Sequence, residues 1–408
     1  MTTILLVNNY HYRRGGADVV YLQQDQLLRE RGWDTAQLSM RHENNLDSRW
    51  SDYFIDEIEF GKNYSLPRKL GMAGTIIYSR HARRQAKRII EAANVRLMHA
   101  HNVYHHLSPS VFAAATAADV PVVLTLHDYK LICPAYNMLA NGEVCEACKG
   151  GRLHNVVRNR CIKGSIALSG LIAVESAVHR ITGAYQRHVN RFVSPSQFLI
   201  DKCVEFGWDR DRFSLVHNSI DAHEHELADQ VGTRFVYIGR LSHEKGMTTL
   251  IDAATRSGVG LDVVGTGPLD QALRRQVADS NADIVFHGFQ TGQALWDILR
   301  GARALVLPAE WYENAPISVL EAYATGKPVI VAAIGGLPEM VAHGQTGLVF
   351  ESRNADALAD ALSQLAAAPD SNVREMGMAA RARAETDYSP RRQGERLEQI
   401  YAEFGVNR

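Results

Sequence analysis

Short runs of β-branched and aliphatic residues alternate with amphipathic helical stretches along the whole chain, and this alternation limits the possible folds more than any other feature. Runs typical of buried strands lie at residues 4–7, 95–99 and 122–126. After residue 190 the pattern restarts, with runs at residues 192–194, 235–239, 261–265, 284–287, 304–308 and 328–331. Apolar strands that alternate with helices are typical of parallel sheets covered on both faces. The sequence therefore predicts an α/β fold of two doubly wound domains.

We expect the first doubly wound domain to span residues 1–195 and the second to span residues 196–385. A last helical stretch over residues 386–408 is expected to pack back toward the first domain. Ligands of open parallel sheets bind beyond the carboxyl ends of the strands. Two such domains therefore predict a cleft between them, lined by the loops that follow the strands.

The composition is that of a globular chain, with 46% hydrophobic and 22% charged residues. No apolar run approaches the ~18 residues that a helix needs to cross a bilayer. The first residues lack the basic segment and the cleavage site of a secretory signal peptide. These features argue against transmembrane, secreted, fibrous and disordered proteins, and we expect a cytoplasmic location.

The net charge of −1 hides an uneven distribution of charge along the chain. Residues 1–200 hold 24 Lys and Arg against 16 Asp and Glu, whereas the remaining residues hold 20 against 29. The near-neutral total argues against nucleic-acid binding, which needs a broad basic face. Basic tracts at residues 62–92 and 152–191 instead favour an anionic membrane surface, at the inner face of the membrane, or a phosphorylated acceptor. A solvated helix face is the alternative for the basic amphipathic stretch at residues 66–93.

Glycine-containing loops follow several predicted strands. Gly15 and Gly16 precede the first helix, where glycine lets the backbone approach a ligand and the helix N-terminus offers free N–H groups to an anion. Gly265 and Gly267 form a similar turn after the run at residues 261–265. Each loop alone is also consistent with an ordinary tight turn, because such turns are common in doubly wound folds.

Charged residues in the second half form a more informative pattern. Arg240 and Lys245 flank a strand-to-helix turn, where two cations form either a diphosphate site or a solvated basic loop. Glu313 precedes a helix that Pro316 would start well, and Glu321 follows eight residues after Glu313 on roughly the same face. Carboxylates so placed can accept hydrogen bonds from sugar hydroxyls on either side of a phosphate. The alternative is a helix-dipole partner followed by a surface residue.

These elements occur in a fixed order: the paired glycines, Gly-Arg-Leu-Ser-His-Glu-Lys-Gly at residues 239–246, Val-Gly-Thr-Gly-Pro at residues 264–268 and the segment from Glu313 to Glu321. In this order they resemble the retaining nucleotide-sugar glycosyltransferases of the GT-B fold, family four, whose two Rossmann-like domains face each other across a cleft. The resemblance runs from the first predicted strand to the last helix. It implies that Arg240 and Lys245 bind the donor diphosphate, that Glu313 contacts the transferred sugar and that Glu321 contacts the ribose.

The resemblance also implies a role for His127, which follows the run at residues 122–126 and matches a cleft histidine near the sugar ring. The residue types alone leave open a histidine that is satisfied in the core. The implied catalytic residues are His127, Arg240, Lys245 and Glu313. The implied donor-binding residues are Gly15, Gly16, Asn218, Gly265, Gly267, Asn314, Ala315, Pro316, Ile317 and Glu321.

The implied reaction moves a hexose from a UDP- or GDP-linked sugar to a saccharide or lipid-linked saccharide acceptor in cell-envelope polysaccharide or glycolipid synthesis. We expect retention of configuration, and we expect no cofactor for catalysis. A nucleotide-sugar epimerase of the same fold and a non-catalytic family member are the alternatives. The presence of all four charged residues, Arg240, Lys245, Glu313 and Glu321, argues against the non-catalytic member.

Four of the five cysteines lie close together in the sequence, at Cys133, Cys145, Cys148 and Cys161. In a reducing compartment the Cys-x2-Cys pair with two flanking cysteines is typical of a structural zinc site. Disulfides and unliganded thiols remain the alternatives. A metal here would hold a loop in place and take no part in the chemistry, and Cys203 is expected to pack in the core.

Overall fold

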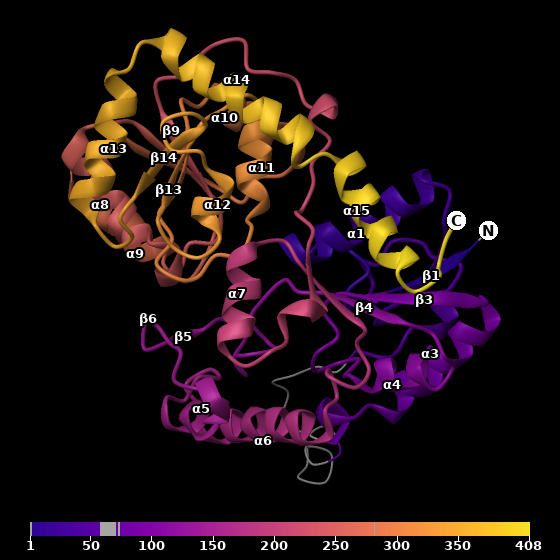
Figure 1. Ribbon diagram of the computed structural model, residues 1–408. Helices are drawn as coiled ribbons and strands as arrows, with labels where there is room; N and C mark the ends of the chain where they lie inside the picture. The colour runs from indigo at the N-terminus through magenta and orange to yellow at the C-terminus, as the bar shows by residue number, and fades with distance from the viewer. Residues whose placement is uncertain (1, 58–70, 72–73, 281) are drawn as a thin grey trace.

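The computed structural model describes residues 2–57, 71, 74–280 and 282–408. The chain forms two α/β domains, each built on a six-stranded sheet (Figure 1). Every strand pairing in these two sheets is parallel. Two doubly wound domains of the GT-B arrangement were predicted, and this fold is confirmed. The first part of the predicted basic stretch, with Lys62, Arg68 and Lys69, lies outside the described residues.

The first sheet has the strand order β2-β1-β3-β4-β7-β8. Its strands are β1 (Thr3–Val7), β2 (Asp34–Leu38), β3 (Val95–Ala100), β4 (Val122–Thr125), β7 (Arg191–Ser194) and β8 (Phe213–Leu215). The described helices of this domain are α1 (Gly16–Glu30), α3 (Arg80–Ala92), α4 (Ser110–Thr116), α5 (His154–Arg158), α6 (Ile166–Thr182) and α7 (Gln197–Glu205). Between β4 and α5 the chain forms a short antiparallel hairpin of β5 (Leu139–Ala140) and β6 (Glu143–Val144).

The second sheet has the strand order β11-β10-β9-β12-β13-β14. Its strands are β9 (Phe235–Ile238), β10 (Leu261–Val264), β11 (Ile284–Gly288), β12 (Leu305–Leu307), β13 (Val329–Ala332) and β14 (Gly347–Phe350). Its helices are α8 (Met247–Ser257), α9 (Asp270–Ala278), α10 (Gly292–Gly301), α11 (Ile317–Ala324), α12 (Leu337–Met340), α13 (Ala355–Ala367) and α14 (Asp370–Thr386). The strand order reverses between β9 and β12, and this is the position where doubly wound sheets bind ligands.

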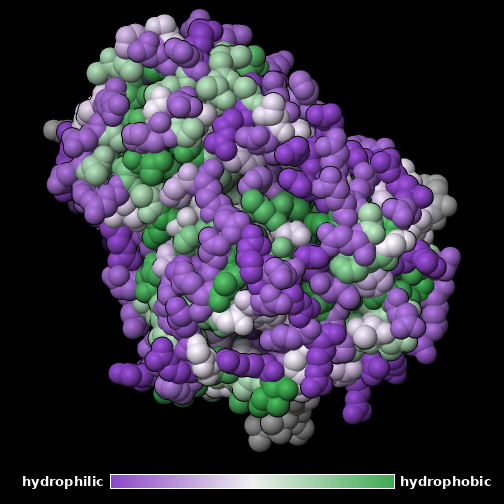
Figure 2. Space-filling model, in the orientation of Figure 1, coloured by the Kyte–Doolittle hydropathy of each residue, from purple (hydrophilic) through white to green (hydrophobic). Residues whose placement is uncertain are grey.

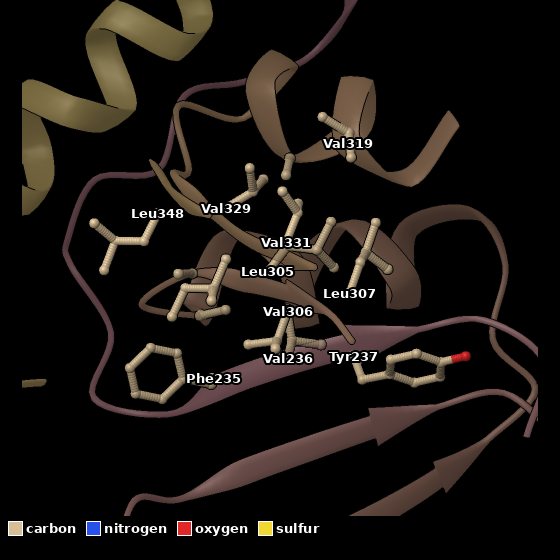
Figure 3. Packing of buried hydrophobic residues seen from close by; sticks show 14 of the residues in the cluster. Phe235, Val236, Tyr237, Leu305, Val306, Leu307, Val319, Val329, Val331 and Leu348 are labelled. Carbon is tan, nitrogen blue, oxygen red and sulfur yellow. The ribbon is translucent and has the colours of Figure 1, made fainter. Parts of the chain in front are cut away.

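The core of the second domain shows why these short strands form. Phe235 and Tyr237 of β9 and Leu305 of β12 are fully or almost fully buried, and Val319 of α11 packs over the same strands (Figure 3). Strands that are apolar on both faces suit a sheet with helices on both sides. The runs predicted at residues 235–239 and 304–308 are therefore central strands of this sheet.

The first sheet extends past residue 195, where the sequence predicted the domain to end. Strand β8 pairs with β7, and Leu199 and Cys203 of α7 pack in the core of the first domain. The hydroxyl of Ser196 caps α7 by accepting a hydrogen bond from the Leu199 backbone N–H, 3.2 Å away. The predicted boundary therefore falls inside the first domain, because the three-residue strand β8 is too short to produce a pattern in the sequence.

After the second domain the chain returns to the first one as α15 (Pro390–Ala402), which lies beside α1 (Figure 1). Leu397, Ile400 and Tyr401 pack against Ile4 and Leu6 of β1. These contacts cover one face of the first sheet with a helix from the end of the chain. The helix thereby joins the two domains a second time.

None of the described helices is both long enough and apolar enough to span a bilayer. The face shown in Figure 2 is mainly hydrophilic, and its hydrophobic residues form small separate groups.

A carboxylate at the contact between α15 and α1 should contribute to stability. Glu398 accepts hydrogen bonds from the Arg31 guanidinium at 2.6 and 3.0 Å and from Trp33 Nε1 at 3.1 Å. The hydrogen bond from Arg31 holds the pKa of Glu398 below its usual value, so the carboxylate stabilises the fold above its unfolded pKa and loses this effect as the pH falls through its folded pKa. We expect Glu398→Ala to lower stability at pH 7 by about 1 kcal/mol, since the pair is partly buried.

Thermal unfolding followed by circular dichroism measures this effect. Glu395→Ala is the matched control on the same helix, because Glu395 is more exposed and its nearest contact to Arg391 is 3.9 Å. Equal melting temperatures for Glu398→Ala and Glu395→Ala would contradict a stabilising role for the Glu398 contact.

Candidate functional site

A cavity of about 160 Å³ lies between the two domains, at the carboxyl ends of the strands of both sheets. The first domain lines it with the start of α1 and with the loop that follows β4. The second domain lines it with the loop between β12 and α11. Gly16 on one side approaches Ile317 on the other, because a Cβ atom on Gly16 would lie 3.9 Å from the Ile317 side chain. The N-termini of α1 and α11 therefore face the same space, where their free N–H groups favour an anion.

The predicted site residues divide into two groups. The residues that line the cavity are Gly16, His127, Asn218, Glu313, Asn314, Ala315, Pro316 and Ile317. Those outside its lining are Gly15, Arg240, Lys245, Gly265, Gly267 and Glu321. Gly15 adjoins the lining as the N-cap of α1, with an extended backbone.

Lys245 reaches the cavity wall through an ion pair with Glu313. Glu313 is 8% exposed, and Trp311 Nε1 donates a second hydrogen bond to its Oε1 at 2.8 Å. The Lys245 ammonium also lies 5.0 Å from the centre of the Trp311 ring. A buried carboxylate needs such partners to remain ionised. The arrangement places a cation and an anion side by side at the edge of the cavity.

A glycine next to Lys245 brings the loops after β9 and β12 together. Gly246 has a φ of 70°, and a Cβ atom there would lie 1.8 Å from the Pro308 carbonyl oxygen. Only glycine combines this backbone conformation with so close an approach. The Lys-Gly pair seen in the sequence therefore sets the distance between the two loops that carry Lys245 and Glu313.

Arg240 is exposed. Burial raises the pKa of the Tyr136 phenol in the first domain, and Arg240 lies close enough to oppose part of this rise. Gly265 and Gly267 lie behind the loop that carries Arg240. Cβ atoms on these two glycines would lie 1.9 Å from the Gly239 carbonyl oxygen and 2.2 Å from the Leu241 carbonyl oxygen. These glycines thus support the Arg240 loop by close packing.

The carboxylate of Glu321, on α11, has no hydrogen-bond or ion-pair partner among the described side chains and backbone groups. It keeps part of its surface exposed, and burial raises its pKa to about 7. A carboxylate in such a setting is well suited to accept hydrogen bonds from ligand hydroxyls.

Two asparagines connect the loops around the cavity. Asn218 Nδ2 donates to the Ala315 carbonyl at 3.0 Å. Asn314 accepts a hydrogen bond from the Ser196 hydroxyl and donates to the Leu126 carbonyl at 3.4 Å, so its side chain joins the two domains. The amide side chain of Asn314 is therefore occupied by the protein, and its backbone N–H is the group that can face a ligand.

His127 ends a column of histidines that runs from the cavity into the first domain. Its Nε2 lies 2.8 Å from Nδ1 of His101, and the His101 ring stacks on that of His99 at 5.1 Å. His99 Nδ1 accepts from the Gln24 amide at 2.9 Å and contacts the Tyr401 hydroxyl of α15 at 2.6 Å. Burial lowers the pKa of His127 to about 4 and that of His99 to about 3. These imidazoles are therefore neutral at neutral pH and act through hydrogen bonds.

Sequence reasoning did not identify His99, His101 or Asp128. His99 lies in β3 and His101 directly follows the strand. Alternate strand positions share a face, so the pattern His-Ala-His was the available signal. Asp128 follows His127, accepts from the Tyr104 hydroxyl at 2.9 Å, and lines the cavity. Burial raises the pKa of Asp128 to about 6.

The four cysteines of the sequence cluster line a second, very small cavity inside the first domain. All five cysteines are unpaired, and no group of three or more His, Cys, Asp or Glu side chains among the described residues stands ready to hold a metal ion. A larger cavity of about 310 Å³ lies among α6, α7 and the loop around Lys130. It shares only Cys148 with the predicted site residues, so we do not assign the reaction to it.

Two family descriptions match the chain. Glycosyltransferase Family 4 matches residues 14–224, just over half of the chain, and Glycosyl transferases group 1 matches residues 220–383. A glycogen synthase of Mycobacterium tuberculosis is 31% identical over 231 residues, which cover 53% of this chain and 55% of the synthase. A GDP-mannose-dependent monoacylated alpha-(1-6)-phosphatidylinositol monomannoside mannosyltransferase of Corynebacterium glutamicum is 36% identical over 172 residues, covering 40% of this chain and 45% of that protein. The chain thus spans about half the length of these curated relatives.

The structure of HepE from Anabaena in complex with UDP-glucose is similar over 99% of this chain and 100% of that chain. The TM-score is 0.68 and the sequence identity is 16%, so this similarity concerns the fold.

The neutral histidine column predicts a loss of stability in mild acid. Below pH ~6.5 an unfolded histidine binds a proton, whereas folded His99, with its pKa of about 3, does not. Each such histidine lowers the free energy of unfolding by up to about 1.4 kcal/mol per pH unit as the pH falls from ~6.5 toward its folded pKa. We expect His99→Gln to reduce the pH dependence of the melting temperature between pH 7 and pH 5.

Melting curves at pH 7, 6 and 5 test this, with His223→Gln as a control on an exposed histidine of the second domain. A wild-type pH dependence that persists in His99→Gln would show that His99 does not stay neutral in the folded protein.

Proposed function

Because the chain belongs to glycosyltransferase family 4, we propose that it transfers a hexose from a UDP- or GDP-sugar to a saccharide or lipid-linked saccharide acceptor, with retention of configuration. The observation that supports this most is the Lys245–Glu313 pair at the edge of the cavity where the N-termini of α1 and α11 meet. This combination offers positive potential for a diphosphate and a carboxylate for sugar hydroxyls.

In the proposed complex the donor diphosphate lies between Arg240 and Lys245 and faces the backbone N–H groups of residues 314–317 and the start of α1. Glu313 accepts hydrogen bonds from the transferred sugar, and Glu321 accepts them from the ribose hydroxyls. His127 contacts the sugar as a neutral imidazole. Its pKa of about 4 leaves a lone pair or an N–H for a hydroxyl, but no positive charge.

The proposed reaction takes place on one face of the sugar. The bond from the anomeric carbon to the diphosphate oxygen breaks, and the acceptor oxygen bonds to the same carbon from the same side. The acceptor proton passes to the departing phosphate oxygen. Arg240 and Lys245 stabilise the charge that develops on the diphosphate, which is the usual role of fixed cations in such transition states. The proposal assigns this stabilisation to the two side chains and needs no catalytic metal.

Loss of either member of the ion pair should abolish most of the transfer activity. We expect Lys245→Ala and Glu313→Gln each to lower kcat/KM by about 100- to 1,000-fold, because each removes a charge placed at the reacting groups. The assay follows release of free nucleotide that depends on acceptor. Asp356→Asn, which breaks an exposed ion pair with Arg256, is the control and should retain wild-type activity. Near-normal turnover in either cleft variant would contradict the proposed site.

A lipid-linked acceptor would require the first domain to meet a membrane. The structure corrects one part of the sequence interpretation, since Ile76, Ile89 and Ile90 are buried in the core and only the basic face of α3 is exposed. Exposed apolar side chains lie instead on α6, where Ile166, Val174 and Ile181 are 56%, 54% and 81% exposed. Val174 and Ile181 are seven residues apart and thus share one helix face.

We propose that the α6 face inserts into the headgroup region of an anionic bilayer while the basic side chains of α3 stay above it. The residues just before α3 adjoin α6, because His179 Nε2 of α6 lies 2.8 Å from the Ile77 carbonyl oxygen. An apolar row beside a basic helix is typical of peripheral contact with anionic lipids. The membrane face concerned would be the cytoplasmic one, where anionic lipids and nucleotide sugars meet.

The double variant V174E/I181E should weaken binding to phosphatidylglycerol vesicles at least about tenfold, because it places two negative charges on the inserted face. Neutralising Arg80, Arg83, Arg84 and Lys87 should weaken binding further at low salt. Met378→Glu changes an exposed apolar residue of the second domain and is the matched control. Vesicle co-sedimentation measures all of these, and unchanged binding by the V174E/I181E variant would rule out α6 as the contact.

A further inference from the structure

Four thiols of the first domain meet inside one small cavity. Cys133, Cys145, Cys148 and Cys161 come from four different points between β4 and α6, and together they line a space of about 10 Å³. The fifth cysteine, Cys203, is fully buried on α7 and does not line this space. Four cysteines therefore form a cluster, whereas the fifth is an ordinary core residue.

The four thiols are close together, because all four cysteines line the same small cavity. Polar groups also surround the sulfurs. The backbone N–H groups of Met138, Ala135 and Asn137 act on the Cys133 sulfur, and Asn159 Nδ2 lies 3.9 Å from Sγ of Cys145. Donors around sulfur are typical of thiolate ligand sites, because they stabilise the negative sulfur.

The chain around the four cysteines has little regular secondary structure to stabilise its backbone conformation. Among the described residues, five of the nine non-glycine residues with positive φ lie in this segment: Tyr136, Met138, Asn141, Arg160 and Lys163. Its regular elements are a hairpin with two residues in each strand and the five-residue helix α5. Segments with so much strained backbone persist only where other contacts hold them, and a bound metal is a common solution.

We propose that Cys133, Cys145, Cys148 and Cys161 bind one structural zinc ion. Four thiolates with a Cys-x2-Cys pair form the preferred tetrahedral ligand set of zinc. The four sulfurs surround the cavity without yet standing at ligating separation, so binding draws the side chains inward and releases the thiol protons to water. Solvent reaches all four residues in part, which leaves an entry path for the ion.

The zinc site would hold the rim of the cavity between the domains, an inference that rests on the proposed function. Glu146, next to Cys145, accepts a hydrogen bond from the Tyr312 hydroxyl at 2.9 Å and pairs with Lys202 at 2.9 Å. Arg353 of the second domain pairs with Glu143 at 2.6 Å. The segment held by the four thiols therefore contacts the residue that precedes Glu313. We therefore expect the conformation of this segment to affect how the second domain packs on the first.

Metal analysis of the full-length protein, purified without a metal-affinity column and kept reduced, tests the site independently of transfer activity. We expect about one zinc per chain in the wild type and in Cys203→Ser, and less than about a tenth of that in Cys148→Ser. Should Cys148→Ser fail to fold, blocking the thiols of the wild type with a mercurial should release one equivalent of zinc, detected with a chromogenic chelator. Wild type that holds no zinc after incubation with zinc chloride, or a mass that shows disulfides in reduced protein, would overturn the proposal.

Limited proteolysis measures whether zinc stabilises the cysteine-containing segment at the rim of the cavity. Removing zinc should speed trypsin cleavage at Lys149 and Arg152 at least tenfold and leave cleavage in the second domain unchanged. If the protein binds zinc but its removal leaves the cleavage rate unchanged, the proposed role at the rim is overturned. If the zinc-bound protein shows no transfer activity, only the proposed function is contradicted.

Discussion

Parallel pairing of every strand in both six-stranded sheets is the constraint on which the rest of this structure depends. Parallel strands place all their following loops at one edge of the sheet, and each sheet here turns that edge toward the other domain. The N-termini of α1 and α11 consequently meet at one cavity, and the loops after β4 and β12 line it. The loop after β9 reaches the edge of the cavity through Lys245, which pairs with Glu313. The return of α15 to the first domain adds a second connection between the halves.

The two walls of the cavity differ in charge. The first domain contributes the neutral imidazole of His127, whose pKa burial lowers to about 4, with His101 and His99 behind it. It also contributes the Asp128 carboxyl, whose pKa burial raises to about 6. The second domain contributes the charged pair of Lys245 and Glu313 and the exposed guanidinium of Arg240. An anionic leaving group is best stabilised by the cationic wall, whereas neutral hydrogen-bonding groups suit the sugar and the acceptor. This division agrees with the roles proposed for the two domains.

The sequence predicted the fold and half of the residues that line the cavity, because apolar runs mark central strands and the loops after them line the cavity. Strands β2, β8 and β14 escaped prediction, since each is short or begins with residues that are not apolar. The spacing of His99 and His101 indicates two side chains on one face, but it does not show that His101 contacts His127, because this contact joins residues 26 positions apart. The sequence also could not predict which apolar side chains stay exposed. It indicated an amphipathic stretch at residues 66–93, but only packing shows that α3 buries its apolar residues and that α6 exposes several of its own.

The central claim is that the cavity between the domains binds the diphosphate of a nucleotide sugar through Lys245. Calorimetric titration of the wild type and of Lys245→Ala with UDP, GDP, ADP and TDP, in buffer without added metal, tests it most directly. We expect the wild type to select UDP or GDP and Lys245→Ala to bind the same nucleotide at least about tenfold more weakly. Failure of the wild type to bind any of the four, or equal affinity in the two proteins, would contradict it.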